Sequence, residues 1–198
     1  VAFCFTPSLQ TSMACVLAIG GHDGSADLDS VEVYKHDDPG WALASGGMNT
    51  LRSAVGAAEF NGRVFVAGGS SGTQLGHTEV ESFTVVEKEE SPGNFHCHWQ
   101  HEPALDQPRM ACSLVLCKDT LWALGGFHTT TTDGVEYLSS DRASWITAHS
   151  MSTPRCSFGA VEMLGSIFAL GGFGRSEEGA LSSCEMLDIR VGAWKSLP

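Results

Sequence analysis

One short segment holds four side chains that can bind a metal ion, His96-Cys97-His98-Trp99-Gln100-His101. Side chains of a strand alternate between its faces, so His96 and His98 share one face while Cys97 and His101 share the other. A tetrahedral zinc site needs four ligands that converge on one point. Because the sequence has no matching pair elsewhere, we predict no metal site and no cofactor.

Catalytic chemistry has one candidate, the adjacent residues His22 and Asp23, which resemble a general base and its orienting carboxylate. Such a base acts on a nucleophile within hydrogen-bonding reach, and the sequence places none near the pair. We therefore expect no catalytic residues and a protein that is not an enzyme.

Glycine pairs close four short apolar runs and could cradle a phosphate group. A phosphate-binding glycine loop leads into a helix, whose first N–H groups face the anion. Here each pair leads into a polar loop and then an alternating segment. We therefore interpret the glycines as structural, at points where the backbone bends or a neighbouring chain approaches closely. They are Gly20, Gly21, Gly68, Gly69, Gly125, Gly126, Gly171 and Gly172.

The glycine pairs mark equivalent positions in an internal repeat, from which the other residues of each unit can be counted. An arginine stands sixteen residues before the first glycine in three units, at Arg52, Arg109 and Arg155, and Cys4 takes that place in the first unit. Two apolar runs lie between arginine and glycines, and in the second unit they are separated by Asn61-Gly62, a strong hairpin-turn signal. Each unit is therefore expected to open with a β-hairpin.

Farther along, each unit has an acidic residue flanked by apolar ones, which predicts a third strand. These segments are 31–34, 80–83, 135–138 and 184–187. A tryptophan, expected to begin the fourth strand, follows the acidic residue by nine positions in three units and by eighteen in the second. The tryptophans are Trp41, Trp99, Trp145 and Trp194, and the second unit thus carries nine inserted residues, which include the charged loop 87–94.

Four strands in each of four units predict an all-β fold, a β-propeller of four four-stranded antiparallel blades. We expect a single propeller region over 1–198, with repeats at about 1–45, 46–102, 103–149 and 150–198. Each tryptophan would fill the space between neighbouring sheets. Each repeated arginine would form a structural ion pair with the repeated glutamate.

The repeated order of an apolar run, Gly-Gly, a variable loop, Val-Glu-x-Tyr and Trp resembles the kelch family. The segments 48–53 and 151–155 are most similar to the branch in which a BTB domain accompanies the kelch repeats. The resemblance implies a kelch-type propeller, which usually has more than four blades. A closed four-bladed ring and a partial propeller both stay open, and no leftover strand is visible to close a ring. The partial propeller is favoured, because exposed sheet faces would otherwise need covering.

In such a propeller, the loops joining second to third strands and fourth to first strands emerge on one face, where binding residues usually lie. The resemblance implies that this face is lined by the residue after each Gly-Gly and by those fifteen and fourteen before the first glycine. The first set is His22, Ser70, Phe127 and Phe173, the second is Phe5, Ser53, Met110 and Cys156, and the third is Thr6, Ala54, Ala111 and Ser157. These sets contain no Arg or Lys, so we expect an apolar or weakly polar peptide held by aromatic anchors.

The resemblance further implies a non-enzymatic protein–protein interaction module, such as the substrate-recognition part of a ubiquitin-ligase adaptor that reaches a cullin-type ligase through other domains. Two alternatives are a kelch-scaffold enzyme, such as a sugar oxidase or mutarotase, and an actin-associated cytoskeletal protein. An oxidase-like copper centre would need two tyrosine ligands, whereas Tyr34 and Tyr137 are expected on separate third strands. The acidic charge disfavours contact with acidic actin.

The amino-acid composition limits the possible binding partners and the cellular compartment of the protein. The net charge of −12 argues against a nucleic-acid partner, and no stretch reaches the roughly 18 apolar residues of a membrane helix. The seven cysteines form no CxxC pair and mostly lie in apolar runs, which indicates a reducing, cytoplasmic location. The chain starts at Val rather than Met, so we expect a piece of a longer protein.

Overall fold

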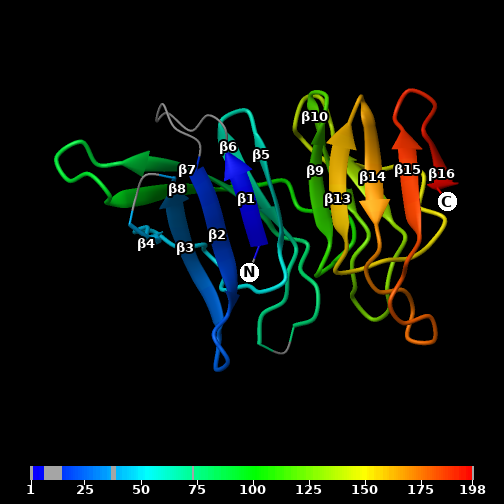
Figure 1. Ribbon diagram of the computed structural model, residues 1–198, viewed down its shortest axis with the longest axis horizontal. Coiled ribbons are helices and arrows are strands. Elements are labelled where there is room, and N and C mark those ends of the chain that lie inside the picture. Colours follow the sequence, from blue (N-terminus) through cyan, green and yellow to red (C-terminus); the bar gives the residue numbers. More distant parts are fainter. Residues whose placement is uncertain (1, 7–14, 37–38, 73, 198) are drawn as a thin grey trace.

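The computed structural model describes residues 2–6, 15–36, 39–72 and 74–197, which form four antiparallel sheets with strands in sequence order (Figure 1). Blade 1 has β1 (Ala2–Thr6), β2 (Cys15–His22), β3 (Asp27–Lys35) and β4 (Ala42–Leu43), and blade 2 has β5 (Gly56–Phe60), β6 (Arg63–Ala67), β7 (Val80–Glu87) and β8 (Phe95–Glu102). Blade 3 has β9 (Ser113–Cys117), β10 (Thr120–Leu124), β11 (Val135–Leu138) and β12 (Trp145–Thr147), and blade 4 has β13 (Gly159–Met163), β14 (Ser166–Leu170), β15 (Cys184–Asp188) and β16 (Ala193–Leu197). The prediction of an all-β propeller with four four-stranded blades is confirmed.

Local turn chemistry explains the first hairpin of a blade. Asn61 and Gly62 both have positive φ, +52° and +72°, and this combination suits the right-handed twist of the flanking strands. Leu164 and Gly165 repeat it in blade 4 with φ of +54° and +76°. The turn residues therefore fix the register of β5 on β6 and of β13 on β14.

The insertion in the second unit lengthens two strands. β8 begins at Phe95, before Trp99, so the expectation that this tryptophan begins the strand is wrong. The inserted residues instead extend the β7–β8 hairpin, whose ladder runs out to Glu87 paired with Phe95 (Figure 1). Lys35 of blade 1 holds the extension through an ion pair of 2.8 Å with Glu87. Only the tip of the hairpin is the charged loop that the sequence predicts.

Strands β1, β5, β9 and β13 pack side by side in that order, and the described residues bury three apolar cores between successive blades. Side chains alternate across each sheet, so a blade contributes to two cores. In blade 2, for example, Val64 and Val66 face blade 1 while Phe65 and Ala67 face blade 3. We call the side packed on the following blade the forward face and the side packed on the preceding blade the backward face.

The repeated tryptophans lie on backward faces. Trp145 is 5% exposed, and its indole N–H donates to the Pro103 carbonyl at 2.9 Å. Trp99 and Trp194 make the same kind of bond to Gly46 and His149, at 3.0 and 2.9 Å. In these three blades the ring packs on the preceding core and also holds the crossover that leads from the preceding blade. Trp41 of blade 1 was expected to be buried in the same way, but it is 48% exposed and lies beside Tyr34.

A buried ion pair recurs in blades 2, 3 and 4. Arg52 is fully buried, and its guanidinium donates to the carbonyls of Gly68 and Glu79 and to the carboxylate of Glu81, at 2.8, 3.0 and 2.9 Å. Arg109 pairs with Glu136 and Arg155 with Glu185 in the same way. The fixed spacing in the sequence therefore corresponds to a fixed contact. Each arginine satisfies the carbonyl of the first repeated glycine in its own blade.

The glutamate of each pair also holds the crossover before its blade. In blade 4 the Glu185 carboxylate accepts the backbone N–H groups of Ser152 and Thr153, at 2.7 and 2.9 Å. Burial alone would raise the pKa of Glu185, but the hydrogen bonds from Arg155 and from these amides outweigh it and lower the pKa below its ordinary 4.5. The carboxylate is thus ionised and fully bonded at neutral pH.

The main chain of the same arginine reaches the preceding blade. The Arg109 carbonyl accepts the N–H of Gly69, the second glycine of blade 2, at 2.9 Å. Gly68 has φ of +65°, and a Cβ there would collide with that carbonyl oxygen. Gly21 and Gly126 donate to Arg52 and Arg155 in the same manner. The glycine pair is therefore needed for close approach between blades.

We predict that Arg155→Met lowers the free energy of unfolding by about 3–5 kcal/mol, because it leaves the buried Glu185 carboxylate without its cation. Urea denaturation followed by tryptophan fluorescence measures the change. Arg190→Met is the matched control, since Arg190 pairs with Asp188 in solvent, and it should leave the midpoint nearly unchanged. Equal effects of the two substitutions would contradict the structural role of Arg155.

The lowered pKa of Glu185 predicts an acid-sensitive contribution to stability. A carboxyl with a lower pKa in the folded state stabilises fully above its unfolded value, near 4.5, and loses that contribution as the pH falls through the folded value. Glu185→Gln should therefore make the decline of unfolding free energy below pH 4.5 shallower than in the unaltered chain. Denaturation curves over a pH series measure this, and identical slopes would refute it.

Candidate interaction surface

The four loops that follow the glycine pairs lie along one edge of the molecule, the lower edge in Figure 1. They connect β2 to β3, β6 to β7, β10 to β11 and β14 to β15. Each starts where a second strand ends, and the antiparallel order of the blades brings all four ends to the same side. We call this edge the loop face.

Paired backbone hydrogen bonds bring together the residues predicted to line this face. Met110 and Phe127 exchange N–H to carbonyl bonds, both of 2.8 Å. Cys156 with Phe173, and Ser53 with Ser70, form the same two-way bridge. The residue after each Gly-Gly therefore lies beside the residue fifteen positions before the first glycine in blades 2, 3 and 4. The side chains of Phe5 and Thr6, the corresponding predictions in blade 1, lie outside the described residues.

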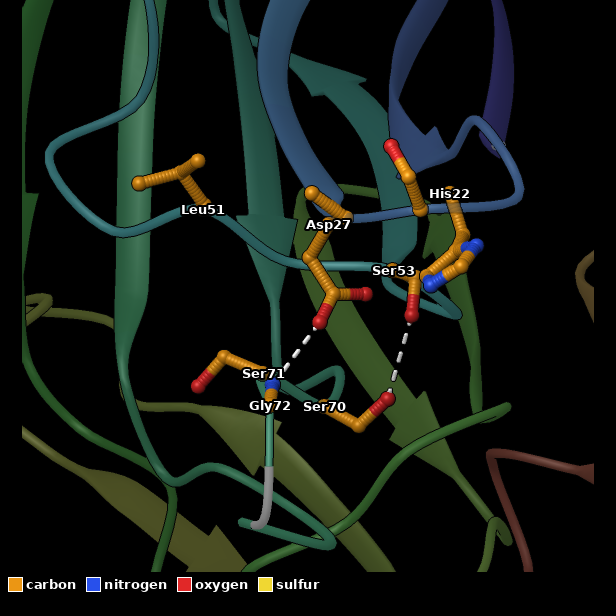
Figure 2. Close-up of a pocket in the computed structure, with 9 residues that line it drawn as sticks. His22, Asp27, Leu51, Ser53, Ser70, Ser71 and Gly72 are labelled. Atoms are coloured by element: carbon orange, nitrogen blue, oxygen red, sulfur yellow. Dashed lines mark hydrogen bonds between the residues drawn. The ribbon is translucent and has the colours of Figure 1, made fainter.

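A polar cavity of about 620 Å³ opens between the loops of blades 1 and 2, where the predicted residues His22, Ser53 and Ser70 meet Asp27 and Gly72 (Figure 2). The hydroxyls of Ser53 and Ser70 lie 3.1 Å apart, and the Gly72 N–H donates to the Asp27 carboxylate at 2.8 Å. Hydrogen bonds from Ser53 and then from the Gly72 amide lower the pKa of Asp27. The cavity therefore presents hydroxyl groups and one anionic carboxylate.

His22 and Asp23 each stabilise the turn of their own loop. The His22 ring accepts the N–H of Gly24 at 2.9 Å. Asp23 accepts the hydroxyl and amide of Ser25 and the amide of Ala26, and these bonds, the Ser25 hydroxyl first, lower the pKa of Asp23 to about 2. Both side chains thus have local structural partners, and His22 also borders the cavity.

A second cavity, of about 380 Å³, lies between the loops of blades 3 and 4. Its lining includes the predicted residues Phe127, Cys156 and Phe173, and the Phe173 side chain is about half exposed. The Thr131 hydroxyl donates to the Gly174 carbonyl at 2.9 Å and joins the two loops. Arg175 adds a cation at the rim. Two Phe rings thus give this cavity an aromatic side that the first one lacks, and the rest of its lining includes threonine and serine side chains.

The third predicted set lines a separate hollow of about 310 Å³ near the inner strands. Ala54, Ala111 and Ser157 all have positive φ, between +49° and +52°. The Ala111 N–H donates to the Ala54 carbonyl at 2.7 Å, and the Ser157 N–H donates to the Ala111 carbonyl at 2.9 Å. Ser157 is therefore apart from the two Phe residues and belongs to a backbone chain that links three blades.

Sequence reasoning missed the residues that the variable loops contribute, among them Asp27, Thr131 and Arg175. These positions have no constant offset from the glycines, because the loops differ in length between units. The repeat pattern therefore could not predict that these residues line the cavities.

The other residues considered for metal binding or catalysis do not converge on one site. The rings of His96 and His98 meet edge to face at 4.5 Å, and Nδ1 of His96 lies 2.9 Å from the Ser45 hydroxyl. Over residues 2–6, 15–36, 39–72 and 74–197, no three His, Cys, Asp or Glu side chains form a group able to hold a metal ion. Tyr34 and Tyr137 lie in blades 1 and 3, beside Trp41 and Trp122 respectively.

Two further observations concern membrane-spanning helices and the cysteine thiols. Within the part of the chain that the structure describes, no helix has the length and apolar character needed to cross a membrane. Cys97, Cys112, Cys117, Cys156 and Cys184 are free thiols. Burial raises the pKa of Cys97 to about 12, so this thiol stays protonated and packs as an apolar group.

The fold and the loop face together define a repeat-built β-propeller whose constant blades support variable loops. The sequence pattern of the Kelch motif family matches residues 154–198, which span blade 4. Blade 4 thus carries a Kelch motif, and the chain resembles the kelch-like proteins, as its sequence predicts.

Known proteins give the same result. Kelch-like protein 40 of Mus musculus is 34% identical over 94 residues, 48% of this chain and 14% of the relative. Kelch-like protein 23 of Mus musculus is 25% identical over 181 residues, 91% of this chain and 30% of the relative. The chain thus spans less than a third of either relative. The solved structure of YjhT superposes with a TM-score of 0.70 at 10% identity, covering 86% of this chain and 52% of that one, and shows the fold alone. Fold and relatives together support a protein-interaction module in general terms.

We predict that Asp27→Ala loosens the loop of blade 2, because it removes the acceptor of the Gly72 amide. Hydrogen exchange of that amide, followed by NMR, should become several-fold faster. The Ser25 amide, which Asp23 holds, is an internal control and should exchange as before. Unchanged exchange at Gly72 would show that the bond between the blades is unimportant.

Proposed function

We propose that this chain is a non-enzymatic interaction module that binds a partner protein or peptide through its loop face. The observation that carries the proposal is the two-way bridge that places Met110 beside Phe127 and Cys156 beside Phe173. It fixes side chains from variable positions onto a rigid backbone, which favours recognition because little order must be gained on binding.

The two cavities indicate the chemistry of the partner. The cavity between blades 3 and 4 is lined by the exposed ring of Phe173 and the partly buried ring of Phe127, and aromatic side chains of this kind form binding hot spots. The cavity between blades 1 and 2 offers hydroxyls and the Asp27 carboxylate, which suit a polar or basic group. The proposed ligand is a largely apolar peptide segment flanked by a hydrogen-bond donor.

The kelch-like relatives support a more specific role. We propose that the chain is the substrate-recognition part of a ubiquitin-ligase adaptor and works in the cytoplasm. Its relatives are more than three times as long, so contact with a cullin-type ligase would fall to domains outside this chain. The free, protonated thiols are consistent with a reducing compartment.

Substitution of the aromatic cavity tests the proposal. Phe173→Asp should reduce the recovery of specific partners by about tenfold or more, because a charge replaces a hot-spot aromatic. The side chain is 53% exposed, so the fold should tolerate the change. Immobilised chain, cell extract and quantitative mass spectrometry give the measurement.

Ile146→Asp is the matched control, since Ile146 is 40% exposed on β12, away from the loop face. It should leave the same partners bound. If Phe173→Asp and Ile146→Asp retain the same set of partners in equal amount, the loop face is not the binding surface.

A further inference from the structure

A buried histidine in the loop between β6 and β7 links a serine to a glutamate. His77 is 3% exposed. Its Nε2 atom lies 2.7 Å from the Ser71 hydroxyl, and its Nδ1 atom lies 2.9 Å from the Glu79 carboxylate. A hydroxyl, an imidazole and a carboxylate within hydrogen-bonding distance of one another, in this order, are the arrangement of an activated serine nucleophile.

The carboxylate fixes which ring nitrogen carries the proton. Burial alone would raise the pKa of Glu79, but the hydrogen bonds from its own backbone amide and from His77 outweigh it and lower the pKa below its ordinary 4.5. An ionised carboxylate only accepts hydrogen bonds, so the neutral ring donates from Nδ1, and Nε2 is left to accept from the Ser71 hydroxyl. His77 is therefore placed to take the serine proton as a general base, and Glu79 is a positioning residue.

The fold does not require a histidine at this place. The His77 N–H donates to the carbonyl of Gly69, the second repeated glycine of blade 2, at 2.9 Å. Thr132 of blade 3 and Leu181 of blade 4 donate to the equivalent glycine carbonyls at 2.9 and 2.8 Å. Threonine and leucine thus serve the same backbone role, so the titratable ring of blade 2 is an addition to the repeat.

The serine is held in place and borders an open cavity. Ser71 and Gln74 exchange backbone hydrogen bonds of 3.1 and 2.8 Å. Ser71 lines the cavity of about 620 Å³ between blades 1 and 2, and Figure 2 shows its hydroxyl pointing away from the Ser53–Ser70 pair. A small ligand can therefore reach a nucleophile whose base is already in position.

We propose that Ser71 accepts an acyl group from an activated ester, with His77 as the general base. The Ser71 oxygen forms a bond to the acyl carbon, and the bond from that carbon to the leaving oxygen breaks. The hydroxyl proton passes to Nε2 of His77 and from there to the leaving alkoxide. The products are a serine ester on the chain and a free alcohol.

The amides beside Ser71 limit the reaction to esters with a good leaving group. An acyl-transfer enzyme stabilises the anionic intermediate with N–H donors that are free to receive it. Here the Gly72 N–H already donates to Asp27, and the Ser71 N–H donates to the Gln74 carbonyl, at 2.8 and 3.1 Å. The serine ester should therefore be long-lived, so the reaction modifies the chain once and does not depend on the proposed partner.

Peptide mapping by mass spectrometry tests the proposal, after the 198-residue chain has reacted with para-nitrophenyl acetate. Ser71 should carry an acetyl group, whereas Ser53 and Ser70, which line the same cavity, should not. His77→Leu introduces the residue type that blade 4 has at this place. It should slow the acetylation of Ser71 by about 100-fold or more, because a general base contributes that much. Ser70→Ala is the matched control and should leave the rate unchanged.

Glu79→Gln separates the chemistry from folding. The Glu79 side chain is 47% exposed, so the fold should persist, and glutamine can still form a hydrogen bond but lacks the charge. Acetylation should slow by about tenfold or more, because the other ring nitrogen can then carry the proton. Nitrogen NMR of the His77 ring should show Nδ1–H in the unaltered chain and a larger share of Nε2–H in the variant.

Three results would overturn the proposal. The first is acetylation of Ser71 that is no faster than that of Ser70. The second is a His77→Leu chain with unchanged tryptophan emission, and hence an intact fold, in which Ser71 reacts at the original rate. The third decides the matter if His77→Leu does not fold, and it is an equal rate for Glu79→Gln and the unaltered chain.

Discussion

The structure depends on a buried arginine that joins two blades at once. The side chain of Arg109 bonds to the Gly125 carbonyl and the Glu136 carboxylate of its own blade, while its backbone carbonyl accepts the N–H of Gly69 in the preceding blade. A buried charge of this kind is tolerated only when it is fully paired. Arginine, glutamate and glycine pair are therefore coupled. Where Cys4 replaces the arginine in blade 1, the corresponding Glu32 is exposed to solvent.

This coupling also positions the loop face. The residue after the arginine and the residue after the glycine pair form the two-way bridge, so the network that joins the blades also aligns Met110 with Phe127. Recognition side chains can then vary without cost to the fold, because the backbone beneath them is held by buried bonds. The two cavities illustrate this, since one is polar and the other aromatic on the same repeated frame.

Much of the fold was predictable from residues that obey local rules. Asn61-Gly62 can adopt the positive φ values of a tight hairpin, and the constant separation of Arg52 from Gly68 reflects a direct hydrogen bond. The extended β7–β8 hairpin was not predictable, because charged residues at an exposed edge read equally well as a loop. The exposure of Trp41 could not be predicted either, because it depends on whether another blade covers the ring and not on the residue type. Asp27 and Arg175 entered the candidate site through loops of unequal length, for which repetition gives no guide.

The central claim is that partners bind at the loop face. Site-specific photo-crosslinking tests it most directly, with a benzophenone amino acid placed at Phe127, or at Leu164 in the β13–β14 turn at the opposite edge (Figure 1). We expect a discrete crosslinked partner from position 127 and none from position 164. A partner that crosslinks at position 164 and not at position 127 would contradict it.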